Sequence, residues 1–239
     1  MKQEQKVLPE FEYILNNIRE ITNNVAEAKD KYRAKDDVVE IMAVTKTVEP
    51  EKVNFAVSQG ITLLGENRVQ EFLSKKDSYD PSAKVHMIGH MQTNKVKYII
   101  NEVEMIQSVD SFKLAGEINK LAMKNNRIMN VLLEVNIGEE LSKSGVSSSA
   151  LTELAKQVSE LQNIRVKGLM AIPPVGADES TFARMKELFE GLRSADIPNI
   201  TMDTLSMGMS GDYELAIKHG SNLVRIGTKL FGARKYLEV

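Results

Sequence analysis

The stretch from residue 8 to residue 33 carries apolar side chains at alternating spacings of three and four residues. This spacing places them on one face of an α-helix, because 3.6 residues make one helical turn. The members of the stripe are Phe11, Ile14, Ile18, Ile21, Val25, Ala28 and Tyr32. The pattern predicts one long amphipathic helix that packs by its apolar face on the surface of a domain.

Beyond this helix the pattern changes to short apolar runs, each followed by a helix or a helical turn. Eight such runs occur, at 38–45, 61–64, 85–88, 103–106, 128–135, 166–170, 200–205 and 223–226. Strands that alternate with helices pair in parallel, and eight such units close into a (β/α)8 barrel. No Pro-, Gly- or Ser-rich linker divides the chain. We therefore predict an α/β protein with a single TIM-barrel domain over residues 1–239 and the helix at 8–33 packed on the barrel.

Active sites of such barrels lie at the carboxyl ends of the strands, so the residues there are candidates for function. In chain order they are Lys46, Glu66, Asn67, His90, Ser108, Asp110, Asn136, Met170, Ser206, Arg225 and Gly227. Phosphate sites in this fold use the loops after the seventh and eighth strands. The stretch from Ser206 to Gly211 and the pair Gly227-Thr228 occupy these positions and are rich in glycine and hydroxyl groups. Backbone amides and hydroxyl donors of this kind bind anions, so the two segments predict a phosphate cradle.

The composition narrows the classes of function. The 239 residues include 31 Lys and Arg against 33 Asp and Glu, a net charge of −2, so no nucleic-acid interface is expected. The absence of cysteine excludes disulfides and thiolate catalysis. No apolar run approaches the length of a membrane span and the N-terminus is polar, so we expect a cytoplasmic protein without a membrane contact. The three histidines lack the spacing of metal ligands, and no metal site is expected.

Lys46 follows the first strand and would point into the same mouth as the phosphate cradle. A lysine that is partly desolvated near other cations loses its proton more easily, and a neutral amine forms an imine with an aldehyde. A phosphate cradle with such a lysine suits pyridoxal phosphate or a sugar-phosphate aldolase. Arg225 either pairs with the phosphate or donates to the pyridine nitrogen of the cofactor. In the second case the guanidinium, which stays protonated, would leave the ring nitrogen unprotonated and weaken the ring as an electron sink.

Three further side chains each allow two interpretations. Asn67 contacts the ring hydroxyl or fixes Lys46, or else it caps the helix that follows. His86 is expected in the barrel interior, where local partners satisfy it, and it is also included among the candidate cofactor contacts. Lys143, in the segment Lys143-Ser144-Gly145, binds a second anion or belongs to a polar loop.

Eight short motifs, in order along the chain, resemble the pyridoxal phosphate homeostasis proteins of the YggS/PROSC type. The motifs are Ala43-Val44-Thr45-Lys46-Thr47, Gly65-Glu66-Asn67-Arg68-Val69-Gln70-Glu71, His86-Met87-Ile88-Gly89-His90-Met91-Gln92, Asn94-Lys95, Ser142-Lys143-Ser144-Gly145, Gly168-Leu169-Met170, Leu205-Ser206-Met207-Gly208-Met209-Ser210 and Val224-Arg225-Ile226-Gly227-Thr228. Each is short, but the ordered set is specific and spans roughly residues 38 to 236.

The resemblance implies a single barrel like the N-terminal domain of alanine racemase. In that case Lys46 matches the lysine that forms the imine with pyridoxal phosphate, and Arg225 matches the arginine that faces the pyridine nitrogen. Asn67 matches a residue near the ring. The phosphate cup is matched by Ser210, Gly227 and Thr228, with Met209 beside it. Members of this family are thought to carry and buffer the cofactor without established catalytic turnover.

Four positions depart from the pattern that is frequent in the family. Val85 stands where many members have tryptophan, Thr45 replaces a frequent serine, and Leu64 replaces a frequent phenylalanine. Gln107 occupies a position where histidine is common. None of the four removes an expected cofactor contact, so they affect only the packing at the mouth.

Three functions remain open at this point. A carrier needs an open mouth, and the chain leaves no room for a lid domain after the eighth strand, so we expect that function. An amino-acid racemase needs a second base opposite Lys46, and no cysteine or strand-end tyrosine supplies one. A lysine-imine aldolase usually has its lysine at the sixth strand, which here ends in Met170 to Pro174. For a carrier, pyridoxal-phosphate-dependent apo-enzymes are the expected recipients, and we expect a monomer, with a dimer as the alternative.

Overall fold

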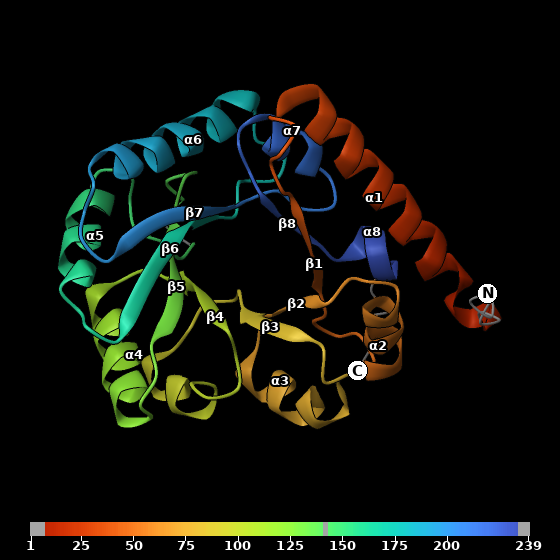
Figure 1. Cartoon of the computed structure of the whole chain (residues 1–239), viewed down its shortest axis with the longest axis horizontal. Helices are drawn as coiled ribbons and strands as arrows, with labels where there is room; N and C mark the ends of the chain where they lie inside the picture. The colour runs from red at the N-terminus through yellow and green to blue at the C-terminus, as the bar shows by residue number, and fades with distance from the viewer. Residues whose placement is uncertain (1–7, 141–142, 234–239) are drawn as a thin grey trace.

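The computed structural model describes residues 8–140 and 143–233, so Ser142 of one motif lies outside the described residues. Eight parallel strands form a closed barrel in the order of the sequence (Figure 1). They are β1 (Glu40–Val44), β2 (Leu63–Glu66), β3 (Lys84–Met87), β4 (Met105–Val109), β5 (Met129–Val135), β6 (Ile164–Ala171), β7 (Ile200–Ser206) and β8 (Leu223–Ile226). Strands β1 and β8 pair directly, with Ala43 opposite Ile226. The barrel predicted from the sequence is therefore confirmed.

Helices surround the barrel and connect consecutive strands (Figure 1). The α-helices are α1 (Glu12–Tyr32), α2 (Pro50–Ser58), α3 (Val69–Lys75), α4 (Phe112–Lys124), α5 (Leu151–Ser159), α6 (Glu179–Ser194), α7 (Tyr213–Lys218) and α8 (Thr228–Phe231). Short 3₁₀ helices are η1 (Pro9–Phe11), η2 (Lys76–Ser78) and η3 (Thr93–Tyr98). In the part of the chain that the structure describes, none of these helices combines the length and the apolar character that crossing a membrane requires.

The strands bury side chains on both of their faces, as parallel strands do. Outward-facing residues join the helices in one large core, whereas Met42, Leu63, Leu223 and Ile88, the residue just after β3, form a separate small cluster. Gly65 makes room for this cluster, because a Cβ there would lie 2.6 Å from Met42 Sδ. Buried polar side chains from β3, β4, β5, β7 and β8 also lie in the strand layer. Some of these side chains lie beneath the candidate site.

Two strands, β2 and β4, extend beyond Leu64 and Ile106, where the apolar pattern predicts their ends. In β2, Gly65 and Glu66 pair with β3 and continue the sheet. The side chains of Glu66 and, in β4, of Gln107 are fully buried. The apolar pattern misplaced both ends because these buried strand residues are polar and find hydrogen-bond partners inside the protein.

Helix α1 confirms the amphipathic helix that the N-terminal pattern predicts. Its buried residues are Ile14, Ile18, Ile21, Val25 and Ala28. The helix runs alongside α7 and α8, the helices that follow β7 and β8 (Figure 1). Asn17 Nδ2 donates to the Leu230 carbonyl at 3.0 Å, and Asn24 Nδ2 donates to Tyr213 Oη at 2.9 Å. The N-terminal helix therefore holds both elements that flank the predicted phosphate cradle.

We expect Ile21→Ala to lower the free energy of unfolding by about 2–5 kcal/mol, because it leaves a cavity between α1 and the barrel. Ile21 is 1% exposed and belongs to the main core. Urea denaturation measures the change, with Glu27→Ala on the exposed face of the same helix as the matched control. Equal effects of the two substitutions would contradict the packing of α1 on the barrel.

Candidate functional site

Lys46 lies in a tight turn that leaves the carboxyl end of β1. The Val48 amide donates to the Thr45 carbonyl at 3.1 Å, so Lys46 and Thr47 are the two central residues of the turn. Thr47 has a φ of 62°, and a positive φ at this position is the mark of type II turns. The Lys46 side chain is half-buried. The turn thus fixes the direction in which Lys46 leaves the strand.

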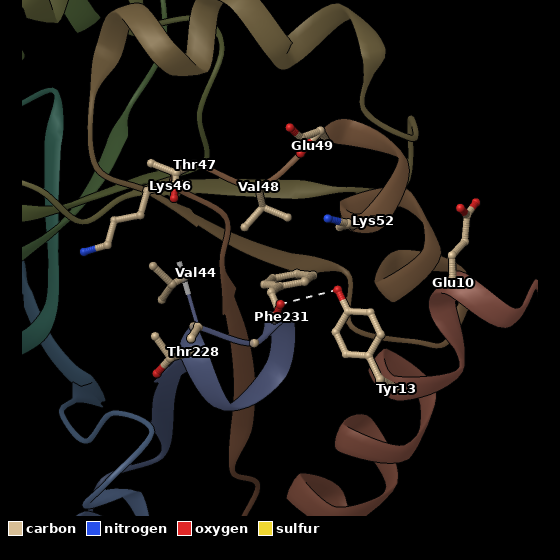
Figure 2. A pocket seen from close by; sticks show the side chains of 13 residues that line it. Glu10, Tyr13, Val44, Lys46, Thr47, Val48, Glu49, Lys52, Thr228 and Phe231 are labelled. Carbon is tan, nitrogen blue, oxygen red and sulfur yellow. Dashed lines mark hydrogen bonds between the residues drawn. The ribbon is translucent and has the colours of Figure 1, made fainter. Parts of the chain in front are cut away.

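A cavity of about 710 Å³ at this end of the barrel is lined by Lys46 together with Gly227 and Thr228. Figure 2 shows Lys46 and Thr228 on one side of the cavity, with Val44 between them. The amino end of Lys46 points away from Tyr13, which lies on the opposite wall (Figure 2). Gly227 and Thr228, two predicted cofactor contacts that follow β8, therefore line the same cavity as Lys46, which follows β1.

The other part of the predicted cradle, Met209 to Gly211, lines a neighbouring cavity of about 610 Å³. The two parts meet where Ser210 Oγ accepts a hydrogen bond from the Lys229 amide at 3.2 Å. Within the cradle, the Met209 amide donates to Asp212 Oδ1 at 2.6 Å, so this amide is already engaged. The anion donors that remain include the hydroxyl groups of Ser210 and Thr228, which the sequence predicts as members of the cup.

Gly208 shapes the loop that carries this part of the cradle. Its φ is +92°, which an L-residue rarely adopts, and a Cβ there would lie 2.6 Å from Ala216 Cβ. The Gly208 carbonyl also accepts a hydrogen bond from the Arg225 amide at 3.0 Å. Glycine at this position thus lets the loop after β7 pack closely against α7, and the Gly208 carbonyl joins the loop to β8.

A chain of buried hydrogen bonds crosses the barrel below the mouth. Arg225 Nη1 donates to Ser206 Oγ at 2.6 Å, and Ser206 Oγ donates to Gln107 Oε1 at 2.7 Å. Gln107 Nε2 lies 3.0 Å from His86 Nδ1. Arg225 Nη2 also donates to the Ala171 carbonyl at 2.7 Å. The chain joins three of the predicted site residues, Arg225, Ser206 and His86, through Gln107, which sequence reasoning did not assign to the site.

The hydrogen bonds of this buried network all run in one donor-to-acceptor direction, because the protonation states of Arg225 and His86 at its two ends are fixed. Burial lowers the pKa of Arg225 to about 10, against the opposing influence of Glu134 and Asp212, and the guanidinium stays charged at neutral pH. Burial, with Lys84 nearby, lowers the pKa of His86 to about 4, so the imidazole is neutral. Its Nδ1 then accepts from the Gln107 amide, and its proton resides on Nε2. Every donor in the chain therefore points from Arg225 toward His86.

The structure places Glu66 away from the mouth, although the sequence predicts it there together with Asn67. Glu66 is a correction: its fully buried carboxylate lies beneath α3, where it accepts hydrogen bonds from Thr45 Oγ1 at 2.7 Å and from Tyr79 Oη at 2.5 Å. Asn67 does not cap α3, since the residue at that position is Arg68 and no side chain caps the helix. Within the described residues, the buried Asn67 Oδ1 has no hydrogen-bond partner.

Glu134 is a buried acid at the mouth that the sequence analysis missed. It is 4% exposed, and one of its oxygens accepts from Ser144 Oγ at 2.7 Å. Burial raises the pKa of Glu134. With His90 and Lys143 it lines a third cavity, of about 580 Å³, where Lys143 pairs with Glu140 at 2.6 Å. Sequence reasoning had no signal for it, because Glu134 lies within the apolar run at 128–135 and parallel strands are buried on both faces.

Comparison with known proteins identifies the family. The profile described as alanine racemase, N-terminal domain, matches residues 17–235. A relative from Aquifex aeolicus, named pyridoxal phosphate homeostasis protein, is 41% identical over 221 residues, which are 90% of this chain and 96% of the relative. The chain belongs to the pyridoxal phosphate homeostasis protein family. The resemblance noted in the motifs is thereby confirmed.

Two solved structures are similar to this member of the pyridoxal phosphate homeostasis family. An unknown protein from Bifidobacterium adolescentis superposes with a TM-score of 0.87 at 30% identity, over 95% of this chain and 98% of the other. PipY of Synechococcus elongatus, solved with pyridoxal phosphate bound, superposes with a TM-score of 0.77 at 30% identity, over 89% of this chain and all of PipY. Gln107, which the resemblance marks as a departure from the family pattern, makes two hydrogen bonds of the buried network.

No group of three histidine, aspartate or glutamate side chains is placed to hold a metal ion, as far as residues 8–140 and 143–233 show. The polar groups of the mouth are instead single side chains, each contributed by a different strand end. This arrangement can grip an anion and present an amine, and it offers no metal cluster within those residues.

We expect the His86 ring to stay neutral down to about pH 4, because burial lowers its pKa from 6.5 to about 4. Below pH 6.5 the unfolded chain binds a proton at this ring that the folded chain does not. The free energy of unfolding should therefore fall as the pH falls from 6.5 toward about 4, by up to about 3 kcal/mol from this group. Urea denaturation as a function of pH and NMR titration of the ring measure both effects. His86→Gln should remove this part of the pH dependence, and a ring that titrates near 6.5 would contradict the assignment.

Proposed function

We propose that this protein binds pyridoxal 5′-phosphate, holds it as an imine of Lys46, and buffers or delivers it without catalytic turnover. The observation that carries the proposal is that Lys46 shares one cavity with Gly227 and Thr228. An amine and anion donors at one site suit a phosphorylated aldehyde. The PLP-bound structure of PipY and the names of the curated relatives support the same ligand.

Two features of the structure test whether the residues fit this ligand. The buried Asn67 Oδ1, without a partner among the described residues, can accept a hydrogen bond from a ring hydroxyl. Arg225 is a fully buried cation fixed by Ser206 and Ala171, so it can donate to a ring nitrogen without reorganising. Both features match what a substituted pyridine would need, and the residues therefore fit.

The charges at the site favour holding over turnover. When bound, the ligand supplies an aldehyde carbon that condenses with amines and a pyridine ring that can draw electrons. Lys46 would hold the ligand through its amine, with one water released on binding and one consumed when hydrolysis frees the ligand. Arg225 keeps its proton at neutral pH and would leave the ring nitrogen unprotonated, which weakens the ring as an electron sink. The site can thus bind the aldehyde covalently while doing little to activate a bound amino acid.

Tyr13 is the one tyrosine that lines the Lys46 cavity among the described residues. It comes from α1, which is why inspection of strand ends did not find it. Its hydroxyl donates to the Phe231 carbonyl at 3.4 Å and lies across the cavity from Lys46 (Figure 2). A racemase would need a second base close to the substrate α-carbon, on the face opposite the lysine. The Lys46 amine points away from Tyr13 (Figure 2), so Tyr13 is the tyrosine to substitute in a test of that alternative and is not placed beside the amine.

We also propose pyridoxal-phosphate-dependent apo-enzymes as the recipients of the ligand, and a monomer in the cytoplasm as the working form. A reversible covalent bond lets the ligand pass to a protein that binds it more tightly. No nucleic acid enters this function, since the net charge of −2 offers no general attraction to a polyanion.

We expect Lys46→Ala to abolish the imine while weaker, non-covalent binding of pyridoxal phosphate remains. The visible absorbance of the imine should disappear, and borohydride treatment of the variant should leave no reduced cofactor attached at position 46. Mass spectrometry of borohydride-treated wild type should place the label on Lys46. Lys52→Ala is the matched control, because Lys52 lines the same cavity from α2. An imine that persists in Lys46→Ala would contradict the assignment.

We expect the loaded protein to leave the α-proton of amino acids in place. Incubation of loaded wild type with L-alanine in D₂O, followed by NMR, measures exchange of that proton. Absence of exchange above the level given by free pyridoxal phosphate agrees with a carrier. Exchange that depends on both Lys46 and Tyr13 would instead establish racemase-like chemistry.

A further inference from the structure

Helix α3 holds the turn that carries Lys46 from outside the barrel. Lys75 Nζ donates to the carbonyl of Thr45 at 3.0 Å and to the carbonyl of Val48 at 3.3 Å. These are the first and last residues of the turn. The carboxylate of Glu71 accepts a hydrogen bond from the Thr47 amide and also binds Lys75 Nζ at 2.7 Å. Three of the four turn residues are thereby bonded to two side chains of one helix.

The turn needs such support because its backbone is strained. Thr47 is β-branched and has a φ of 62°, a region that such residues rarely enter. A conformation of this kind persists only where surrounding contacts determine it. The Thr47 amide is held by its hydrogen bond to Glu71, and Lys75 fixes the carbonyl groups of Thr45 and Val48 on either side.

A buried network holds Lys75 in turn. The Lys75 side chain is 12% exposed, and its Nζ lies 3.6 Å from Oε1 of Glu66. The carboxylate of Glu66 is fully buried. Glu66 also accepts from Thr45 Oγ1 and Tyr79 Oη, which limits the positions open to it. Burial opposes ionisation of Glu71, but hydrogen bonds from Lys75 and the Thr47 amide hold its pKa below the ordinary value. The contact between α3 and the turn is therefore made by charged groups with few alternatives.

We propose that Lys75 and Glu71 are positioning residues for Lys46, which set where its amine meets the aldehyde without touching the ligand themselves. This inference rests on the proposed function of Lys46. In the described part of the chain, their hydrogen bonds go to the turn and to each other, and the phosphate cradle lies on the loops after β7 and β8. Their effect should therefore fall on formation of the covalent bond and spare recognition of the phosphate.

The test compares two ligands that differ only at the reacting carbon. Pyridoxal phosphate carries an aldehyde there, and pyridoxine phosphate carries an alcohol that cannot form an imine. For Lys75→Met and Glu71→Ala we expect the affinity for pyridoxal phosphate to fall about tenfold, because misplacing a reacting group by about 1 Å has effects of this order or larger. The affinity for pyridoxine phosphate should stay within about twofold of wild type, because its contacts are unchanged.

Two matched variants separate positioning from folding. Glu71→Gln keeps an oxygen that accepts from the Thr47 amide and should restore most of the affinity lost in Glu71→Ala. Lys76→Met removes the neighbouring lysine, which pairs with Asp77 and Glu102 and not with the turn, and it should behave as wild type. Glu71 is 21% exposed, so its substitution should leave a folded barrel even if Lys75→Met does not.

A second readout uses the protein without ligand. Hydrogen exchange at the Thr47 amide should accelerate in Glu71→Ala and return toward the wild-type rate in Glu71→Gln. Exchange at the wild-type rate in Glu71→Ala would overturn the inference, as would equal losses for the two ligands. If Lys46→Ala abolishes the imine while Lys75→Met and Glu71→Ala bind pyridoxal phosphate normally, only this inference fails. If the imine survives Lys46→Ala, the proposed function fails first.

Discussion

Closure of the barrel between β1 and β8 is the constraint on which the site depends. Ala43 pairs with Ile226, and this register places the residues just after β1 beside those just after β8. Lys46 and the Gly227-Thr228 pair, which lie far apart in the sequence, therefore line one cavity. A parallel sheet with an open edge would leave these segments at opposite sides of the molecule. The meeting of an amine with anion donors is thus a consequence of topology before it is one of local chemistry.

A buried cation inside the barrel explains why the interior is polar. Arg225 has lost its contact with water, and a charge in such a place needs hydrogen-bond acceptors to offset the desolvation. Ser206 and the Ala171 carbonyl provide them, and each partner must then satisfy its own remaining groups. Ser206 donates its hydroxyl proton to Gln107, and the amide nitrogen of Gln107 in turn finds its acceptor in the neutral ring of His86. A glutamine suits this chain because one end of its amide accepts and the other donates.

The sequence predicts the barrel, the N-terminal helix and the meeting of Lys46 with the cradle, because each follows from periodicity or from strand order. It does not predict which face of a strand a polar residue occupies when both faces are buried. Glu66 was placed at the mouth for this reason, whereas its partners Thr45 and Tyr79 lie beneath α3. Tyr13 was missed because it reaches the cavity from a helix outside the strand order. Side-chain contacts of this kind depend on tertiary packing that periodicity does not encode.

Two helices on the outside of the barrel divide the work of holding the site. Helix α1 binds α7 and α8, so it fixes the side of the mouth that carries the anion donors. Helix α3 binds the turn after β1 through Lys75 and Glu71, so it fixes the amine. The affinity for a phosphate and the position of the Lys46 amine can then vary separately, because contacts of α1 support the first and contacts of α3 support the second. Under the proposed function, such separation lets the strength of the covalent bond change while recognition of the phosphate stays intact.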